Sequence, residues 1–79
     1  MTPCYVIWID AFADAHGWCE LDQLEAVPRV ISTVGWLLAD QVPDHVSVAQ
    51  SHDGDSVDSV LHIPRSAVRD IVQLEEPMP

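Results

Sequence analysis

Two arginines, Arg65 and Arg69, stand four residues apart in a chain whose other charged side chains are almost all acidic. The 79-residue sequence holds thirteen Asp and Glu, three Arg and no Lys, and its formal net charge is −10. A guanidinium group can donate two hydrogen bonds at once to a phosphate. Together with the Ser66 hydroxyl, the pair predicts a small anion-binding site. A surface ion pair with Asp70 or Glu75 is the alternative interpretation.

The acidic balance argues against a groove for DNA or RNA, because phosphate neutralisation needs several cationic side chains and this chain has three. An acidic surface can instead keep a protein in solution, steer a basic partner or mimic nucleic acid. The second hypothesis is therefore an interaction protein whose acidic face occupies a basic site on a host protein. That face groups the N-terminal acids Asp10, Asp14, Glu20, Asp22 and Glu25.

Other chemically active residues form no recognisable catalytic or metal pattern. The stretch 52–58, "HDGDSVD", lacks the terminal bidentate Glu of a calcium loop, and a tight hairpin turn explains the same residues. The two cysteines have no paired histidines at zinc spacing. Ser51 beside His52, and Cys19 near His16, do not by themselves indicate a triad. We predict a protein that is not an enzyme and uses no cofactor or metal.

Length and composition predict one domain over residues 1–79, with an ordered core of about 4–74 and a tail at 75–79. No apolar run approaches the roughly 18 residues that span a bilayer. The N-terminus lacks the basic start and cleavage site of a signal peptide, so we expect the cytoplasm, with Cys4 and Cys19 as thiols. Because so short a chain buries a marginal core, we expect a homo-oligomer.

Runs of β-branched and aromatic residues separated by turn signals predict five antiparallel strands. Pro64 should end the fourth strand, because proline cannot donate to the ladder, and 64–67 is short enough for one 3₁₀ turn. Gly35 marks a bulge or bend that permits close approach. The predicted strands are 5–12, 29–38, 46–51, 57–63 and 68–74.

Residues 13–28 show no sustained period and predict a long irregular loop with one helical turn. The loop either packs against the domain through Trp18 and Leu21 or carries function. Trp18 and Tyr5 are our candidates for stacking on a nucleobase, with loop anchoring as the alternative for Trp18. The first strand, Tyr5–Phe12, is apolar on both faces, so its second face needs a cover from this loop or from a second subunit.

The stretch "LHIPRSAVRDIVQL" resembles the second signature of Sm-like proteins. The resemblance implies a small five-stranded Sm-like or SH3-like antiparallel barrel. In the bacterial Sm-like RNA chaperone, a Lys-His pair in this turn lines the nucleotide pocket of a ring. Here Arg65-Ser66 stands in its place, a basic N-terminal helix is lacking and the net charge has the opposite sign. RNA binding is therefore not implied.

The chain also resembles small bacteriophage proteins of no assigned activity. The residues that carry this likeness are Trp8, Asp10, Ala11, Thr33, Val34, Gly35, Trp36, Leu37, Ala49, Gln50, Ser51, Ile63, Pro64 and Arg65. The resemblance implies a phage accessory protein acting in the bacterial cytoplasm, a class that includes anti-defence factors. Some of those are small oligomers that sequester nucleotide immune signals.

The leading hypothesis is a non-catalytic phage oligomer that binds a small anionic, nucleotide-type defence signal. Arg65, Ser66 and Arg69 would meet the phosphate, and Trp18 or Tyr5 would meet the base. The alternatives are the acidic interaction protein and a structural accessory that binds no ligand. We expect neither a nucleic-acid groove nor a membrane partner.

Overall fold

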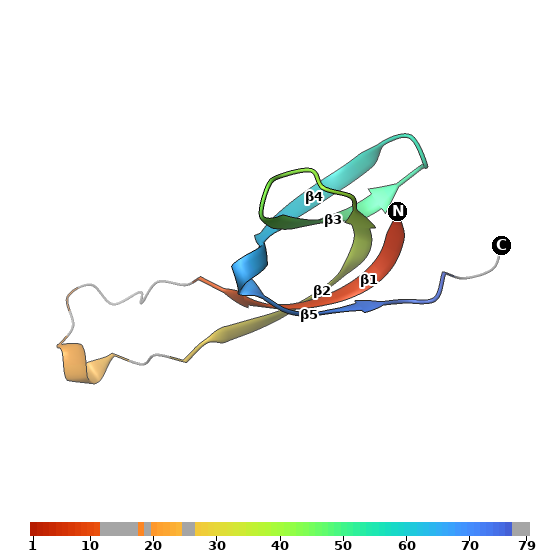
Figure 1. Cartoon of the computed structure of the whole chain (residues 1–79). Coiled ribbons are helices and arrows are strands. Elements are labelled where there is room, and N and C mark those ends of the chain that lie inside the picture. The colour runs from red at the N-terminus through yellow and green to blue at the C-terminus, as the bar shows by residue number, and fades with distance from the viewer. Residues whose placement is uncertain (12–17, 19, 25–26, 77–79) are drawn as a thin grey trace.

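The computed structural model describes residues 1–11, 18, 20–24 and 27–76 (Figure 1). Its elements follow the predicted order of strands and turns, with strand ends that differ from the prediction by a few residues. None of the helices in this part of the chain is long and apolar enough to cross a membrane. The elements are β1 (Thr2–Asp10), η1 (Leu21–Gln23), β2 (Arg29–Leu38), β3 (His45–His52), β4 (Val57–Pro64), η2 (Arg65–Ala67) and β5 (Val68–Gln73).

The five strands form one antiparallel sheet in the order β4-β3-β2-β1-β5. The predicted mostly β architecture and the 3₁₀ turn between the last two strands are confirmed. Within its described residues, the predicted loop 13–28 contains the 3₁₀ turn η1; residues 13–17, 19, 25 and 26 lie outside the described part. Because β4 and β5 are the two edges of an open sheet, closure into a barrel stays a prediction.

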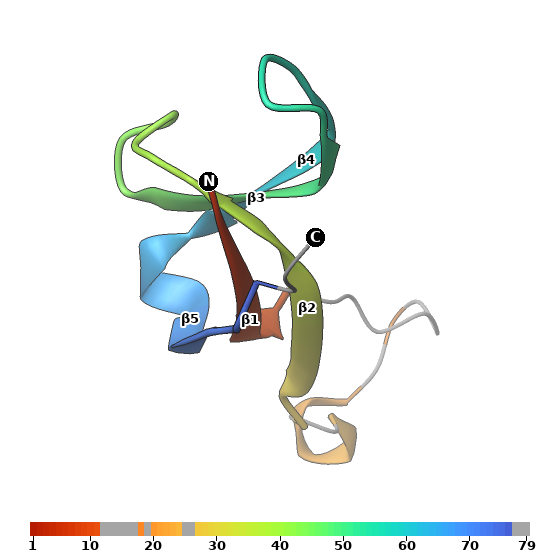
Figure 2. The same ribbon diagram turned by 90° about the vertical axis from the view of Figure 1, so that its right-hand side faces the viewer.

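Strand β2 joins the two halves of the sheet and curves strongly along its length (Figures 1 and 2). It pairs with β1 from Arg29 to Leu37, whereas β3 pairs with it only at Trp36–Leu38. Gly35 stays in register with Cys4 in the β1–β2 ladder, so it is not a bulge there. Its role is the close approach: a Cβ at Gly35 would lie 2.5 Å from Val48 Cγ1 and 2.6 Å from the Ala49 carbonyl oxygen.

The core is small and lies inside this bend, between the β1–β2–β5 part of the sheet and the β3–β4 part. Trp8, Leu37, Ala67 and Val68 pack around it. Its buried residues are Cys4, Val6, Val46, Val48 and Ile63. Cys4 is a free thiol, as predicted, and burial raises its pKa above the ordinary value, so it is kept neutral as a small apolar residue. Cys19 lies outside the described residues.

The close approach at Gly35 predicts that Gly35→Ala destabilises the fold. Overpacking costs about 1–3 kcal/mol, and here one of the obstructing atoms is backbone oxygen, which cannot move without disturbing β3. Urea unfolding monitored by tryptophan fluorescence measures the change. The exposed Val57→Ala variant on β4 is the control, with an expected loss below about 1 kcal/mol. A Gly35→Ala protein as stable as the wild type would contradict the packing described.

Candidate anion-binding site

The turn that carries Arg65 and Ser66 is fixed by its backbone. Strand β4 ends at Pro64, and the Arg65 amide donates to the Asp44 carbonyl oxygen at 2.8 Å. The Val68 amide donates to the Arg65 carbonyl and closes the 3₁₀ turn η2. Ala67 and Val68 pack against the core. The turn is therefore held both by the hydrogen bond to Asp44, in the loop before β3, and by packing on the core. Side chains on its solvent side are therefore presented from a rigid base.

Arg65, Ser66 and Arg69 are all exposed on this segment. In the described part of the chain, neither guanidinium forms an ion pair or a side-chain hydrogen bond. The predicted alternative, an ion pair with Asp70 or Glu75, is therefore not the arrangement of the structure. Two cations remain available to an external anion, although the chain holds thirteen carboxylates.

Arg69 occupies an irregularity in the β1–β5 ladder. Ile7 lies opposite Asp70, while the next residue, Trp8, lies opposite Val68. The register therefore shifts by one residue and leaves Arg69 without an opposite residue in β1. A bulge bends its strand and redirects a side chain, and bulges are frequent at sheet edges and beside functional sites. No local pattern of residues predicts this bulge, because the register depends on which residues of the distant β1 strand are paired.

The two aromatic candidates do not join this turn. Tyr5 lies opposite Val72 of β5, three residues and roughly 10 Å along the strand from Arg69. Its hydroxyl donates to Ser32 Oγ at 2.9 Å, across the β1–β2 ladder. Trp18 is fully exposed, and the neighbouring η1 lies beyond the end of the β1–β2 ladder, away from η2 (Figure 1). Its expected role as a loop anchor is wrong, because it contacts nothing that buries it.

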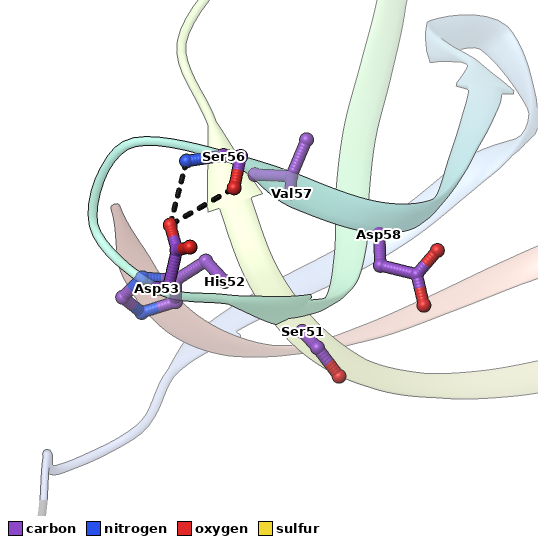
Figure 3. Close-up of a pocket in the computed structure, with 6 residues that line it drawn as sticks. All are labelled: Ser51, His52, Asp53, Ser56, Val57 and Asp58. Atoms are coloured by element: carbon purple, nitrogen blue, oxygen red, sulfur yellow. Dashed lines mark hydrogen bonds between the residues drawn. The ribbon is translucent and has the colours of Figure 1, made fainter.

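A shallow pocket of about 270 Å³ lies at the β3–β4 hairpin, and sequence reasoning did not propose it as a site (Figure 3). Its lining residues are Ser51, His52, Asp53, Ser56, Val57 and Asp58. Within the residues that the structure describes, no group of three His, Cys, Asp or Glu side chains could hold a metal ion. The predicted hairpin turn is confirmed, with Gly54 at φ 101°.

Asp53 organises this hairpin (Figure 3). Its carboxylate accepts hydrogen bonds from the Ser56 amide at 2.8 Å, the Asp55 amide at 3.0 Å and the Ser56 hydroxyl at 3.0 Å. These donors, the Ser56 amide first, hold the Asp53 pKa below its ordinary value. The Gly54 amide donates to His52 Nδ1, and the His52 ring meets Trp36 edge-on. The polar groups of the pocket therefore maintain the turn.

A serine–histidine pair that the sequence did not suggest joins β3 to β4. Ser47 Oγ and His62 Nδ1 lie 2.7 Å apart, on residues that face each other in the ladder. Ser47 is buried while His62 is exposed. A nucleophile must be reachable by substrate and needs its base oriented by a third group. The described contacts provide no such group, so the bond fits a structural role, the satisfaction of a buried hydroxyl.

Comparisons with protein-family models, with curated proteins and with solved structures each find no match to the chain. The Sm-like and phage resemblances therefore stay predictions. The closing turn at Arg65–Arg69 is the feature on which a functional proposal can rest.

The Asp53 hydrogen bonds predict a pH dependence of stability. A carboxyl whose pKa is lowered in the folded state stabilises that state above the unfolded pKa, about 3.9 for aspartate, and this contribution is lost as the pH falls through the folded value. Asp53→Ala should lower the urea midpoint at pH 7 and reduce its fall on acidification. Asp55→Ala, which removes a neighbouring exposed carboxylate, is the matched control. Equal pH profiles for the two variants would show that Asp53 has no such role.

Proposed function

We propose that this protein is a non-catalytic binding protein that captures a small anionic ligand of the nucleotide type at the turn between β4 and β5. Arg65 and Arg69 donate to its phosphates, and Ser66 adds a hydroxyl. One observation carries the proposal: both guanidinium groups are exposed and have no carboxylate partner in the described part of the chain. In so acidic a chain, unpaired cations on an anchored turn are best explained by an external anion.

The charge distribution supports a small ligand over a polymer. A nucleic acid needs many cations along its backbone, and a surface with a net charge of −10 repels it. A nucleotide presents one to a few phosphates, which two planar guanidinium groups can hold by paired hydrogen bonds. The same net charge should slow encounter with an anion, so association should accelerate as salt screens the repulsion.

For the fold, we propose more than the open five-stranded sheet. We infer a small Sm-like or SH3-like barrel, with the sheet curled so that β4 and β5 lie on either side of η2. The strand order, the curvature of β2 and the short 3₁₀ connection before β5 support it. Copies of such a barrel in a homo-oligomer would repeat the Arg65–Arg69 site by symmetry. The accompanying biological role is that of a phage accessory protein that sequesters a nucleotide defence signal in the host cytoplasm.

The second candidate is an acidic interaction protein that blocks a basic site on a host protein. Glu20 and Asp22 are exposed beside the exposed Trp18 and Leu21, a combination of charge and apolar surface that suits a protein partner. Asp10 lies at the end of β1, while Asp14 and Glu25 lie outside the described residues. Capture of a basic host protein that weakens steeply with salt would favour this candidate.

Isothermal titration against cyclic nucleotides, ADP-ribose-type nucleotides and inorganic pyrophosphate tests the leading proposal. We expect binding that the double variant Arg65→Ala/Arg69→Ala weakens at least about tenfold, because charge-assisted hydrogen bonds contribute about 1.5–3 kcal/mol each and 1.4 kcal/mol is tenfold. Arg29→Ala removes the same charge at the start of β2 and should change the dissociation constant less than about twofold. Absence of binding across the panel, or equal binding by the double variant, would refute the proposal.

A further inference from the structure

The outer face of the β1–β2–β5 sheet is apolar where a solvent-facing sheet is normally polar. Cys4 and Val6 point into the core, so the alternate β1 residues point outward, and the ladders place β2 and β5 residues beside them. Asp70 is the one charged residue among the described ladder positions on this side. We call these positions the outer face, and its apolar members are Pro3, Tyr5, Ile7, Ile9, Val30, Val34, Trp36 and Val72.

Much of the outer face is open to solvent in the single chain. Val30, the second residue of β2, is 60% exposed, and Val34, in the middle of that strand, is 64% exposed. Contiguous apolar surface of this kind marks an interaction site in proteins that remain in solution. Of the thirteen acids in the chain, Asp70 alone lies among the described ladder positions of this face.

The outer face is too small to hold two copies together by itself. Three strands about 4.8 Å apart, over roughly six residues of 3.4 Å rise, make a flat patch on the order of 300 Å². A stable interface buries about 800 Å² on each partner. Whatever covers the outer face must therefore bring additional surface with it.

The same chain carries a second exposed apolar surface, which we call the apolar arm: Trp18, Leu21, Leu24 and Val27. Trp18 is 105% exposed and Leu21 is 87% exposed, so neither packs on its own sheet. A tryptophan alone buries about 150–250 Å² in a contact. The arm surrounds η1, which lies beyond the end of the β1–β2 ladder (Figure 1). The apolar arm can therefore supply the additional contact area that a stable interface needs beyond the outer face.

We propose that two copies of this chain form a two-fold dimer in which the apolar arm of each copy lies on the outer face of the other. The β1–β2 ladder ends at the Asp10–Arg29 pair, and η1 lies beyond that end, so a second copy placed next to it can contact the arm (Figure 1). A copy rotated by a two-fold axis near this pair brings its own outer face under the arm. Each chain offers one arm and one face, so the exchange is reciprocal and closed.

The partner chemistry favours a second copy over other occupants. Glu20 and Asp22 stand on the arm and would be repelled by an anionic lipid surface. A basic protein would find almost no countercharge on the outer face. This dimer is independent of anion binding at Arg65 and Arg69, and either proposal can fail without the other.

Light scattering during size-exclusion chromatography tests the dimer. We expect a mass about twice the 8.7 kDa of one chain. The arm variant Trp18→Ser/Leu21→Ser should raise the dissociation constant at least about tenfold, and since both residues are exposed it should leave the circular dichroism of the sheet unchanged. The face variant Val34→Gln/Val72→Gln should raise the dissociation constant of the dimer in the same way. Val57→Gln, a 42% exposed valine on β4, should leave the dimer intact.

Mixing the two variants separates reciprocal exchange from other dimers. The arm variant keeps its face and the face variant keeps its arm, so the mixture regains one of the two contacts and should associate more tightly than either variant alone. Added salt should strengthen association, because each copy carries a net charge of −10 and salt screens the repulsion between copies. The Debye screening length falls from roughly 10 Å at 0.1 M to about 3 Å at 1 M ionic strength. A monomeric wild type, a dimer unaffected by the arm variant, or no gain on mixing would overturn the proposal.

Discussion

The structure depends on the contact between β2 and β3 at Gly35. Because this residue has no side chain, the Val48 side chain and the Ala49 carbonyl can lie where a Cβ would otherwise stand. That approach lets β2 curve so that it pairs with β1 from Arg29 to Leu37 and with β3 at its last residues, Trp36–Leu38. The buried core lies inside the curve, and the turn before β5 packs on that core through Ala67 and Val68.

The proposed function follows from one property of that turn: its backbone is fixed, while its arginine side chains are free to bind a ligand. The backbone is fixed by the Arg65 amide bond to Asp44 and by core packing, whereas the guanidinium groups of Arg65 and Arg69 make no internal bond in the described part of the chain. A backbone that is already fixed lowers the conformational entropy lost when its side chains bind a ligand. The acidic remainder of the chain then acts as a filter against polyanions, because long-range repulsion grows with the charge of the ligand.

Local signals in the sequence predicted the strands and turns well. Pro64 lacks an amide donor, "DG" at 53–54 favours a tight turn, and alternating valines mark β3, so each is decided by neighbouring residues. The bulge at Arg69 and the Ser47–His62 bond were not predictable, since both depend on which distant strands pair and in which register. The expectation that Trp18 anchors its loop was also wrong, because apolar character predicts burial without saying on which surface.

The central claim is that Arg65 and Arg69 bind a phosphate-bearing ligand, and the arginine Nε–H signals in a ¹⁵N-correlated NMR spectrum test it most directly. The chain has three arginines, so the spectrum has three such signals, each assignable with a single Arg→Lys variant. Titration with inorganic pyrophosphate and with an ADP-ribose-type nucleotide should shift the Arg65 and Arg69 signals together along one saturating curve and leave Arg29 in place. Equal small shifts of all three, or none, would contradict the account.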